Sequence, residues 1–501
     1  MDEICILQLG TEDWNKRYQL PTNARLTFAP EFTKAPKEPY DIVFLDRQPK
    51  KEEYDALPRA TRAYTLFVTE NVALEGQMEE LYACKCGQVL PTEQLQQFFR
   101  QELRFFFSNA YGKKLRMTDL AVAQHFSGTV QWNGSAELTL EGNYGDTMKQ
   151  AAYWRSQFPI HLGQVMDVWL EYEKDAGVSI ELELTLLAAG SQAAVLARER
   201  FCEEELEQVV RVEGVKRDGL LFASVRAKGD GTLKIRGLHI RNSRGTHGHL
   251  LPGGVRFVTS EREEIFAYFD PGDRKPPLNV FFSGQQSVEG FEGYEMMRDM
   301  NSPFLLFSET RLEGGSFYLG SEEYEKLIRD VIKDKMTELG FSSDQVVFSG
   351  LSMGSSGALY YGSAFGPHAV IVGKPLVNIG NVAANEKWMR PGGFPASLDV
   401  LQYLAGNTDP ASVLALNRRF LDKFDVADWS NTKFIVAYML EDDYDPEGYA
   451  TLLEHLQSGG VQVYGKGIHG RQNDNAPVVL QWFMEQYKKV LSEDFGRGDK
   501  K

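Results

Sequence analysis

The sequence predicts an α/β protein in three parts: an N-terminal α/β domain (residues 1–115), a central β-sandwich of jelly-roll type (116–250) and a C-terminal α/β domain with a doubly wound parallel sheet (251–495). Two observations support this division. At 501 residues, the chain is too long for one hydrophobic core. Its apolar pattern also changes twice, from short continuous runs to strict alternation and back to runs separated by helical segments. Only residues 496–501 are expected to be frayed.

Composition excludes several classes of function. Hydrophobic residues make up 43% of the chain and charged residues 25%, as in globular proteins. Lys and Arg total 54 against 70 Asp and Glu, and the formal charge of −16 repels nucleic acid and anionic lipid. The acidic N-terminus does not resemble a signal peptide, and no stretch approaches the ~20 apolar residues of a membrane span. We therefore expect no nucleic-acid partner and no membrane insertion.

The four cysteines are too few for a disulfide framework and suit a reducing compartment such as the cytosol. Cys84 and Cys86 form a C-x-C pair, but no second Cys/His pair follows at zinc spacing. They are interpreted as cysteines of a strand, and no metal site is expected.

The first part shows the pattern of an α/β sheet. Short apolar runs at residues 4–9, 41–45 and 64–68 are bounded by Pro, Asn and charged residues, which predicts buried strands. From 92 to 111, apolar side chains recur near a 3.6 period, which predicts a helix packed on that sheet. The side chains in question are Leu95, Phe98, Phe99, Leu103 and Phe106.

The central part alternates apolar and polar residues, as antiparallel strands do. The clearest runs are 135–144, 178–187 and 231–242. Five aromatic residues there could form a platform for sugar rings, but burial in the core is the commoner role of aromatics in a sandwich. These residues are Trp132, Tyr144, Trp154, Trp169 and Tyr172.

The third part follows a turn-rich segment at 241–254, whose Gly and Pro content marks a domain edge. Buried strands and helical segments then alternate, which predicts a doubly wound sheet; the helix is expected at Glu322–Leu339. The predicted strands are Leu278–Gly284, Ser302–Glu309, Gln345–Gly350, His368–Lys374, Thr432–Leu440 and Val461–Gly465.

The strongest chemical signal is the G-x-S-x-G motif with Ser352 at its centre. It directly follows a predicted strand and precedes a small-residue helix start, the context of the nucleophile elbow of α/β hydrolases. In that turn the serine hydroxyl is exposed, and the flanking glycines avoid a clash of Cβ atoms. An ordinary structural turn is the alternative.

A serine hydroxyl needs a base, which in this fold comes later in the chain. His469 lies in a glycine-flanked loop after the last predicted strand, where the base is normally delivered. His455 lies in a helical segment and is interpreted as a surface or packing residue.

The orienting acid should follow the preceding strand. Four acids stand there, and position favours Glu441 and Asp442 equally, ahead of Asp443 and Asp445. A solvated turn is the alternative for such a charge run.

An oxyanion formed at Ser352 needs two backbone donors. One should be the N–H of Met353, which follows the nucleophile, and the other that of Gly284 or Gln285, which follow an early strand. A plain strand-to-helix turn is the alternative at Gly284. The chemistry requires no metal.

Several segments together resemble a known family, the second accessory secretory protein of the accessory Sec system. They are ILQLGTEDW, YDIVFLDR, the central sandwich, GLSMGSSGALYYG, YMLEDDYD and GIHGRQND. The resemblance covers the whole chain. It implies an α/β-hydrolase domain with Ser352 as nucleophile and His469 as base, and it favours Glu441 over Asp442 as the acid.

The resemblance also implies a function. Members of that family look like acetyltransferases that add O-acetyl groups to N-acetylglucosamine on serine-rich repeat glycoprotein adhesins during export. The implied partners are the glycosylated adhesin, the other accessory secretory proteins and the motor ATPase. No tightly bound cofactor is expected, and an acetyl donor such as acetyl-CoA would be a co-substrate. The implied location is cytoplasmic, including a peripheral position at the translocase.

Two alternatives stay open. A carbohydrate acetyl-esterase would use the same residues, because the outcome depends on whether a sugar or water reaches the acyl-enzyme first. A non-catalytic export scaffold would use the hydrolase fold only as a binding surface.

Overall fold

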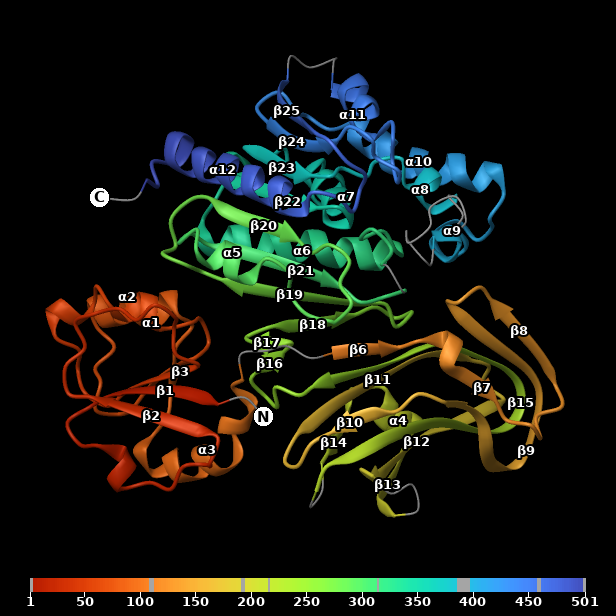
Figure 1. Cartoon of the computed structure of the whole chain (residues 1–501), viewed down its shortest axis with the longest axis horizontal. Helices are drawn as coiled ribbons and strands as arrows, with labels where there is room; N and C mark the ends of the chain where they lie inside the picture. The colour runs from red at the N-terminus through yellow and green to blue at the C-terminus, as the bar shows by residue number, and fades with distance from the viewer. Residues whose placement is uncertain are drawn as a thin grey trace.

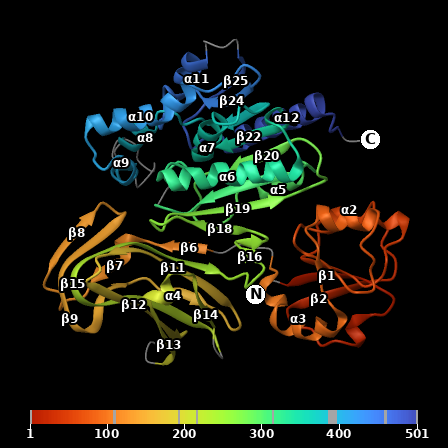
Figure 2. The same ribbon diagram turned by 180° about the vertical axis from the view of Figure 1, so that it is seen from behind.

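The computed structural model describes residues 3–107, 112–190, 194–214, 217–312, 315–384, 397–456 and 461–498. Three large sheets organise it. The eight-stranded sheet and its helices lie at the top of Figures 1 and 2. The N-terminal sheet and the ten-stranded sheet lie side by side below them. No helix within the described ranges has both the length and the apolarity that crossing a membrane demands.

The N-terminal sheet has five parallel strands with helices on both faces (Figure 1). Successive strand residues point to opposite faces, so Ile6 and Phe44 pack with α3, whereas Leu7 and Val43 pack with α1 and α2. In spatial order the strands are β2 (Ala24–Ala29), β1 (Ile4–Leu9), β3 (Ile42–Leu45), β4 (Leu66–Val68) and β5 (Gln88–Val89). The helices are α1 (Leu57–Ala60), α2 (Gln77–Cys84) and α3 (Leu95–Gln101).

Two expectations for this part differ from the structure. The helix expected at 92–111 is shorter: α3 is flanked by 3-10 turns, and residues 108–111 lie outside the described ranges. Crowded aromatic side chains explain this, because they disfavour a long regular helix. Cys84 ends α2, and Cys86 lies in the following turn with φ 45°, so the interpretation as strand cysteines is wrong.

The central part forms one continuous antiparallel sheet of ten strands. Two strands, β9 and β15, are long enough to pair with several partners, and they bend together where Gly145 faces Gly229 and Gly142 faces Gly231. All four glycines have positive φ, which side chains disfavour. The strands are β6 (Gly112–Leu115), β7 (Leu120–Val122), β8 (Thr129–Asn133), β9 (Glu137–Trp154), β10 (Phe158–Ile160), β11 (Val165–Lys174), β12 (Val178–Ala188), β13 (Val195–Cys202), β14 (Val210–Glu213) and β15 (Gly219–Asn242). The short helix α4 (Glu203–Leu206) follows β13.

The aromatic residues of this part divide as follows. Tyr144, Trp154, Trp169 and Tyr172 are buried, as expected of core residues, whereas Trp132 is exposed on β8. Four of the five side chains are therefore unable to form a platform for sugar rings.

The third sheet has eight strands. Six of them, β20 to β25, are parallel to one another. The strands β18 and β19 add an antiparallel edge that the sequence analysis did not identify, so the sheet is mixed. In spatial order the strands are β18 (Val255–Val258), β19 (Glu264–Asp270), β21 (Phe304–Glu309), β20 (Leu278–Phe282), β22 (Val346–Leu351), β23 (Ala369–Gly373), β24 (Lys433–Met439) and β25 (Gln462–Ile468). A two-stranded ribbon, β16 (Gly248–His249) and β17 (Leu251–Pro252), precedes it.

Helices cover both faces of this sheet. One apolar cluster includes α6, α7 and α10, and the other includes α5 and α12. The helix predicted at Glu322–Leu339 is confirmed; it begins after the N-cap Ser321 and ends at Gly340 with φ 72°. The helices are α5 (Tyr294–Arg298), α6 (Glu322–Leu339), α7 (Met353–Gly362), α8 (Ile379–Ala384), α9 (Ser397–Ala405), α10 (Pro410–Asp425), α11 (Gly448–Leu456) and α12 (Ala476–Phe495).

The parts of the chain meet at positions that the sequence did not indicate. The strand β6 lies before the expected boundary at residue 115, yet it pairs with β15 of the ten-stranded sheet. Arg497, in the segment expected to be frayed, donates to both carboxylate oxygens of Asp273 and to the carbonyl oxygen of Asn301, so the chain is held there.

Buried charges join the ten-stranded and eight-stranded sheets. Arg241 of β15 donates to both carboxylate oxygens of Glu264 on β19, at 2.8 and 2.6 Å, and also to Glu289. His239 of β15 lies between Glu289 and Glu171. Because each charge has a partner of opposite sign, this junction tolerates burial that an isolated charge would not.

Candidate active site

Ser352 occupies the tight turn between β22 and α7, with φ 53° and ψ −122°. A residue with a side chain pays about 1–3 kcal/mol for such a conformation, which persists only where the surroundings enforce it. A Cβ at Gly350 would lie 2.2 Å from the carbonyl oxygen of Gly354, and one at Gly354 would lie 2.0 Å from that of Phe282. The turn therefore requires both glycines of the motif, and it places Ser352 beyond the carboxyl end of β22.

His469 and Glu441 meet at the same edge of the sheet. His469 directly follows β25, and Glu441 comes two residues after β24, the adjacent parallel strand. His469 Nδ1 lies 3.0 Å from Glu441 Oε1, and Gly470 N–H donates to Oε2 at 2.5 Å. That N–H, and next the imidazole, lower the pKa of Glu441. The pair is open to solvent, with 85% of the His469 side chain exposed.

The other candidate residues of this region have different partners. Asp442 accepts two backbone N–H groups of its own turn, and burial raises its pKa. Asp445 is buried and accepts two backbone N–H groups that follow β23. His455 pairs with an aspartate at the end of α10. The structure thus brings Glu441, and not Asp442, to His469.

The hydroxyl of Ser352 contacts Gln472, a residue that the sequence analysis did not single out. Gln472 Nε2 donates to Ser352 Oγ at 3.1 Å, and only 1% of Gln472 is exposed. Within the described ranges, no hydrogen bond joins Ser352 to His469. The available signal was weak: Gln472 is a polar residue three positions after His469, in the same loop.

A buried lysine holds this loop over the strand ends. Lys374 directly follows β23, and its Nζ donates to the carbonyl oxygens of Gln472 at 2.6 Å and Asp474 at 2.9 Å. Burial lowers the pKa of Lys374. The Asn475 side chain donates to the His469 carbonyl oxygen at 2.6 Å. These bonds set the positions of His469 and Gln472 relative to β23.

The three residues expected to supply oxyanion donors line one cavity of about 230 Å³. Met353 begins α7, and the first N–H groups of a helix have no partner within it. Gly284 and Gln285 follow β20, which pairs with β22. The N–H of Gly284 donates a hydrogen bond to the carboxylate of Glu292. Burial raises the pKa of Glu292. Gly284 is therefore occupied, and the candidate donors are the N–H groups of Met353 and Gln285.

The comparisons with known proteins agree over the whole chain. The family described as "Asp2: Accessory Sec system GspB-transporter", where Asp2 is a protein name, matches residues 4–497. The accessory Sec system protein Asp2 of Staphylococcus aureus (strain NCTC 8325 / PS 47) is 38% identical over 459 residues, which is 91% of this chain and 88% of that protein. The protein of the same name from Streptococcus gordonii is 34% identical over 507 residues, 99% of each chain.

A solved structure is also similar. A chain of the Glycosylation Associate Protein (Gap123) complex from Streptococcus agalactiae has a TM-score of 0.88 and 35% sequence identity, and the similarity covers 99% of each chain. The similarity therefore extends to the arrangement of all three sheets. On these matches, the chain belongs to the Asp2 family of the accessory Sec system.

Proposed function

We propose that the protein is an O-acetyltransferase of the α/β-hydrolase type that acetylates N-acetylglucosamine on a serine-rich repeat glycoprotein adhesin and supports its export. One observation carries the enzymatic part: Ser352 is held in a strained turn at the sheet edge where His469 and Glu441 form a pair. Strain at a turn between strand and helix is typical of an exposed nucleophile.

In the first half-reaction, Ser352 Oγ attacks the carbonyl carbon of an acetyl donor such as acetyl-CoA. His469 accepts the hydroxyl proton at Nε2, because its Nδ1 faces Glu441, whose charge stabilises the imidazolium. The N–H groups of Met353 and Gln285 stabilise the oxyanion. When the tetrahedral intermediate collapses, the leaving group takes the proton from His469, and the acetyl group remains on Ser352.

In the second half-reaction, a sugar hydroxyl attacks the acetyl-serine and gives its proton to His469. The oxygen of Ser352 leaves as the new ester forms and regains the proton from the imidazolium, so the enzyme returns to its starting state. Attack by water instead would make the protein an acetyl-esterase. No tightly bound cofactor takes part in either half.

The assembly part of the proposal rests on the family. The similar chain from Streptococcus agalactiae belongs to a complex of glycosylation-associated proteins, and we propose an equivalent complex with the other accessory secretory proteins. The glycosylated adhesin and the motor ATPase are the further proposed partners. The reaction would take place in the cytoplasm or at the translocase, before the adhesin is exported. A purely non-catalytic scaffold is the alternative.

The test replaces Ser352 by Ala in the producing cell and measures O-acetyl groups on the exported adhesin by mass spectrometry. Loss of acetylation with export intact is the expected result, and Ser363→Ala, near the end of α7, is the matched control. Unchanged acetylation in Ser352→Ala rules out the catalytic role. A rise in acetylation identifies the protein as an esterase. A burst of phenol from a chromogenic acetyl ester reports the acyl-enzyme in vitro.

A further inference from the structure

The loop after β20 is fixed by hydrogen bonds at each of its first two residues. Ser283 N–H donates to the Phe307 carbonyl oxygen at 3.0 Å, and the Ser283 carbonyl oxygen accepts a 2.7 Å bond from the Tyr318 hydroxyl. Glu292 makes two more bonds to this loop. Its N–H donates to Ser283 Oγ at 3.2 Å, and its carboxylate accepts the N–H of Gly284. The backbone is therefore held by side chains from two other segments as far as Gly284.

The same loop lies against the turn that carries the proposed nucleophile. A Cβ placed on Gly284 would lie 3.1 Å from the carbonyl oxygen of Leu351, the residue directly before Ser352. The N–H groups of Gln285 and Met353 form no hydrogen bond to any residue of the described ranges. Both N–H groups therefore stay available to an oxyanion, and a shift of the loop would move one of them relative to Ser352.

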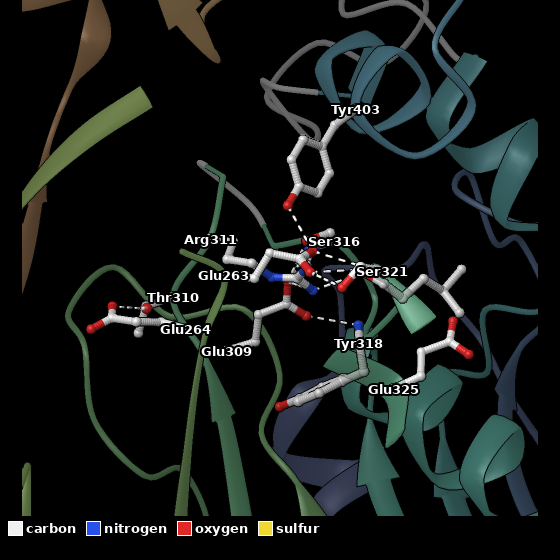
Figure 3. Close-up of polar contacts among 12 residues, drawn as sticks. Glu263, Glu264, Glu309, Thr310, Arg311, Ser316, Tyr318, Ser321, Glu325 and Tyr403 are labelled. Atoms are coloured by element: carbon white, nitrogen blue, oxygen red, sulfur yellow. Dashed lines mark hydrogen bonds and ion pairs between the residues drawn. The ribbon is translucent and has the colours of Figure 1, made fainter. Parts of the chain in front are cut away.

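Tyr318 is held in an unfavourable backbone conformation. Phe317 and Tyr318 are consecutive buried residues with φ of 58° and 61°, a region in which residues other than Gly, Asn and Asp are uncommon. Figure 3 shows the carboxylate that holds this turn: Glu309 accepts the N–H groups of Ser316 at 2.8 Å and Tyr318 at 2.7 Å. Arg311 lies 2.9 Å from the same carboxylate. Backbone strain that the surroundings enforce in this way often marks a functional position.

Tyr318 connects the two segments that supply the proposed oxyanion donors. Its carbonyl oxygen accepts the Tyr361 hydroxyl at 2.7 Å, and Tyr361 belongs to α7, the helix that begins at Met353. Its ring extends away from the cluster around Glu309 (Figure 3), and its hydroxyl reaches Ser283 on the other segment. The placement of the two segments relative to one another therefore depends on this residue.

From these contacts we infer that Tyr318 and Glu292 are positioning residues of the proposed enzyme. They hold the Ser283–Gly284 peptide in the place from which the N–H of Gln285 donates to the oxyanion formed at Ser352. Both act through the backbone of the loop, and neither touches the substrate. The inference rests on the proposed function, because it takes Ser352 to be the nucleophile.

Four substitutions test these contacts. Tyr318→Phe removes only the hydroxyl, and Glu292→Ala removes the acceptor of the Gly284 N–H. Glu292→Gln keeps an acceptor oxygen at the same place, so it should preserve the function that Glu292→Ala loses. Tyr324→Phe is the matched control, because Tyr324 is fully buried in the same apolar cluster and its hydroxyl has no hydrogen-bond partner in the part of the chain that the structure describes.

The first measurement is the turnover of a chromogenic acetyl ester by the full chain. Loss of a whole oxyanion donor lowers kcat about 10²- to 10³-fold, so displacement of one should cost part of that. We expect kcat to fall about 10- to 100-fold in Tyr318→Phe and Glu292→Ala, with KM unchanged. Affinity for a trifluoromethyl ketone, whose adduct with Ser352 carries an oxyanion, should fall by the same factor. Glu292→Gln and Tyr324→Phe should behave as the wild type does.

The second measurement, hydrogen exchange at the Gly284 amide, reports the same contacts without any turnover. Exchange should be about tenfold faster in Tyr318→Phe and Glu292→Ala than in Tyr324→Phe. Melting temperature checks that each variant is folded, and the pair Glu292→Ala and Glu292→Gln carries the test if Tyr318→Phe does not fold.

The outcomes separate this inference from the proposed function. Wild-type kinetics in Tyr318→Phe and Glu292→Ala overturn it, and so does a loss of kcat without a loss of affinity for the ketone. Equal losses in both, with faster exchange at Gly284, support it. If Ser352→Ala turns over the ester as fast as the wild type, the proposed function fails, and the exchange rates alone then decide whether the two residues hold the loop.

Discussion

Gln472 Nε2 donates a hydrogen bond to Ser352 Oγ over 3.1 Å. The oxygen of the proposed nucleophile is therefore an acceptor in this state, and its own proton is free to pass to a base. Gln472 is buried, and Lys374 donates a hydrogen bond to its main-chain carbonyl oxygen. The side-chain amide of Gln472 therefore approaches Ser352 from a fixed direction. Gln472 acts on the reaction through Ser352, which makes it a positioning residue.

Replacing Gln472 should slow catalysis moderately. A typical hydrogen bond contributes about 0.5–1.5 kcal/mol, so Gln472→Ala should lower kcat for a chromogenic acetyl ester about 2- to 13-fold. KM should stay the same, because the bond is made to the enzyme's own hydroxyl. Asn473→Ala, at the exposed neighbouring position, is the control. An increase in kcat would mean that the amide restrains the hydroxyl in an unproductive orientation.

The conformation of Ser352 predicts a conflict between stability and activity. Ser352→Gly should raise the free energy of unfolding by about 1 kcal/mol, since glycine adopts a positive φ without strain, and it should abolish ester turnover. Ser363→Gly, where φ is −58°, should instead lower stability by about 0.5–1 kcal/mol. Denaturant titration measures both. No gain in stability for Ser352→Gly would show that the turn is not strained.

Removing the charge of Glu441 and removing that of Asp442 should have very different effects on kcat. Glu441→Gln removes the carboxylate at His469, and we expect kcat to fall about 100-fold or more, although by less than in a buried triad, because this pair is exposed. Asp442→Asn should leave kcat nearly unchanged, since within the described ranges Asp442 accepts hydrogen bonds from the backbone of its own turn, whereas it is Glu441 that faces His469. Steady-state kinetics on one ester compares them. Equal losses would contradict the assignment of Glu441 as the acid.

The buried junction should make stability fall at acid pH. Burial alone would raise the pKa of Glu264, but Arg241 and Arg256 outweigh it and hold the pKa well below its ordinary value. The contribution of Glu264 to the free energy of unfolding is therefore fully present above its pKa in the unfolded chain, about 4.3. It is lost as the pH falls through the lower pKa that Glu264 has in the folded protein. Glu264→Gln should cost about 3–5 kcal/mol at neutral pH, because it leaves buried arginines uncompensated. Chemical denaturation checks this, with the exposed Glu204→Gln as control.

The same junction should lose stability at higher pH through His239. Burial alone would lower the pKa of this histidine, but Glu289 and Glu171 outweigh it and raise the pKa. The contribution of His239 to the free energy of unfolding is complete below the pKa of the unfolded chain, about 6.5. It disappears as the pH rises through the higher pKa that His239 has in the folded protein. His239→Gln should remove this part of the pH dependence. An identical profile for the variant would show that His239 does not titrate in the native state.

The sequence alone predicted much of the eight-stranded sheet. Its buried parallel strands are continuous apolar runs, and the helix at Glu322–Leu339 has a clear 3.6 period with an N-cap and a final glycine. The strands β2, β5, β18 and β19 were missed. The first three are edge strands, which are short or mix polar with apolar residues, whereas β19 lies inside the sheet between β18 and β21 and is buried along its whole length. The alternating runs predicted antiparallel strands, but alternation does not specify how many sheets those strands form.

Local sequence also located the proposed nucleophile, base and acid, because each follows a recognisable strand. The turn at Ser352 depends on glycines two residues away, which the motif contains. Position along the chain did not decide which acid faces His469, since adjacent side chains at a strand end differ only in direction; the family resemblance favoured Glu441, which is the acid that the structure places there.

What the sequence by itself determined is therefore local: strands, helices, the elbow and the order of the reactive groups, all of which arise from neighbouring residues. Only the tertiary structure decided that Gln472 bonds to Ser352 and that Glu292 occupies the N–H of Gly284. The bond between Gln472 and Ser352 joins residues 120 positions apart, and it depends on the loop position that long-range contacts such as Lys374 to Gln472 establish.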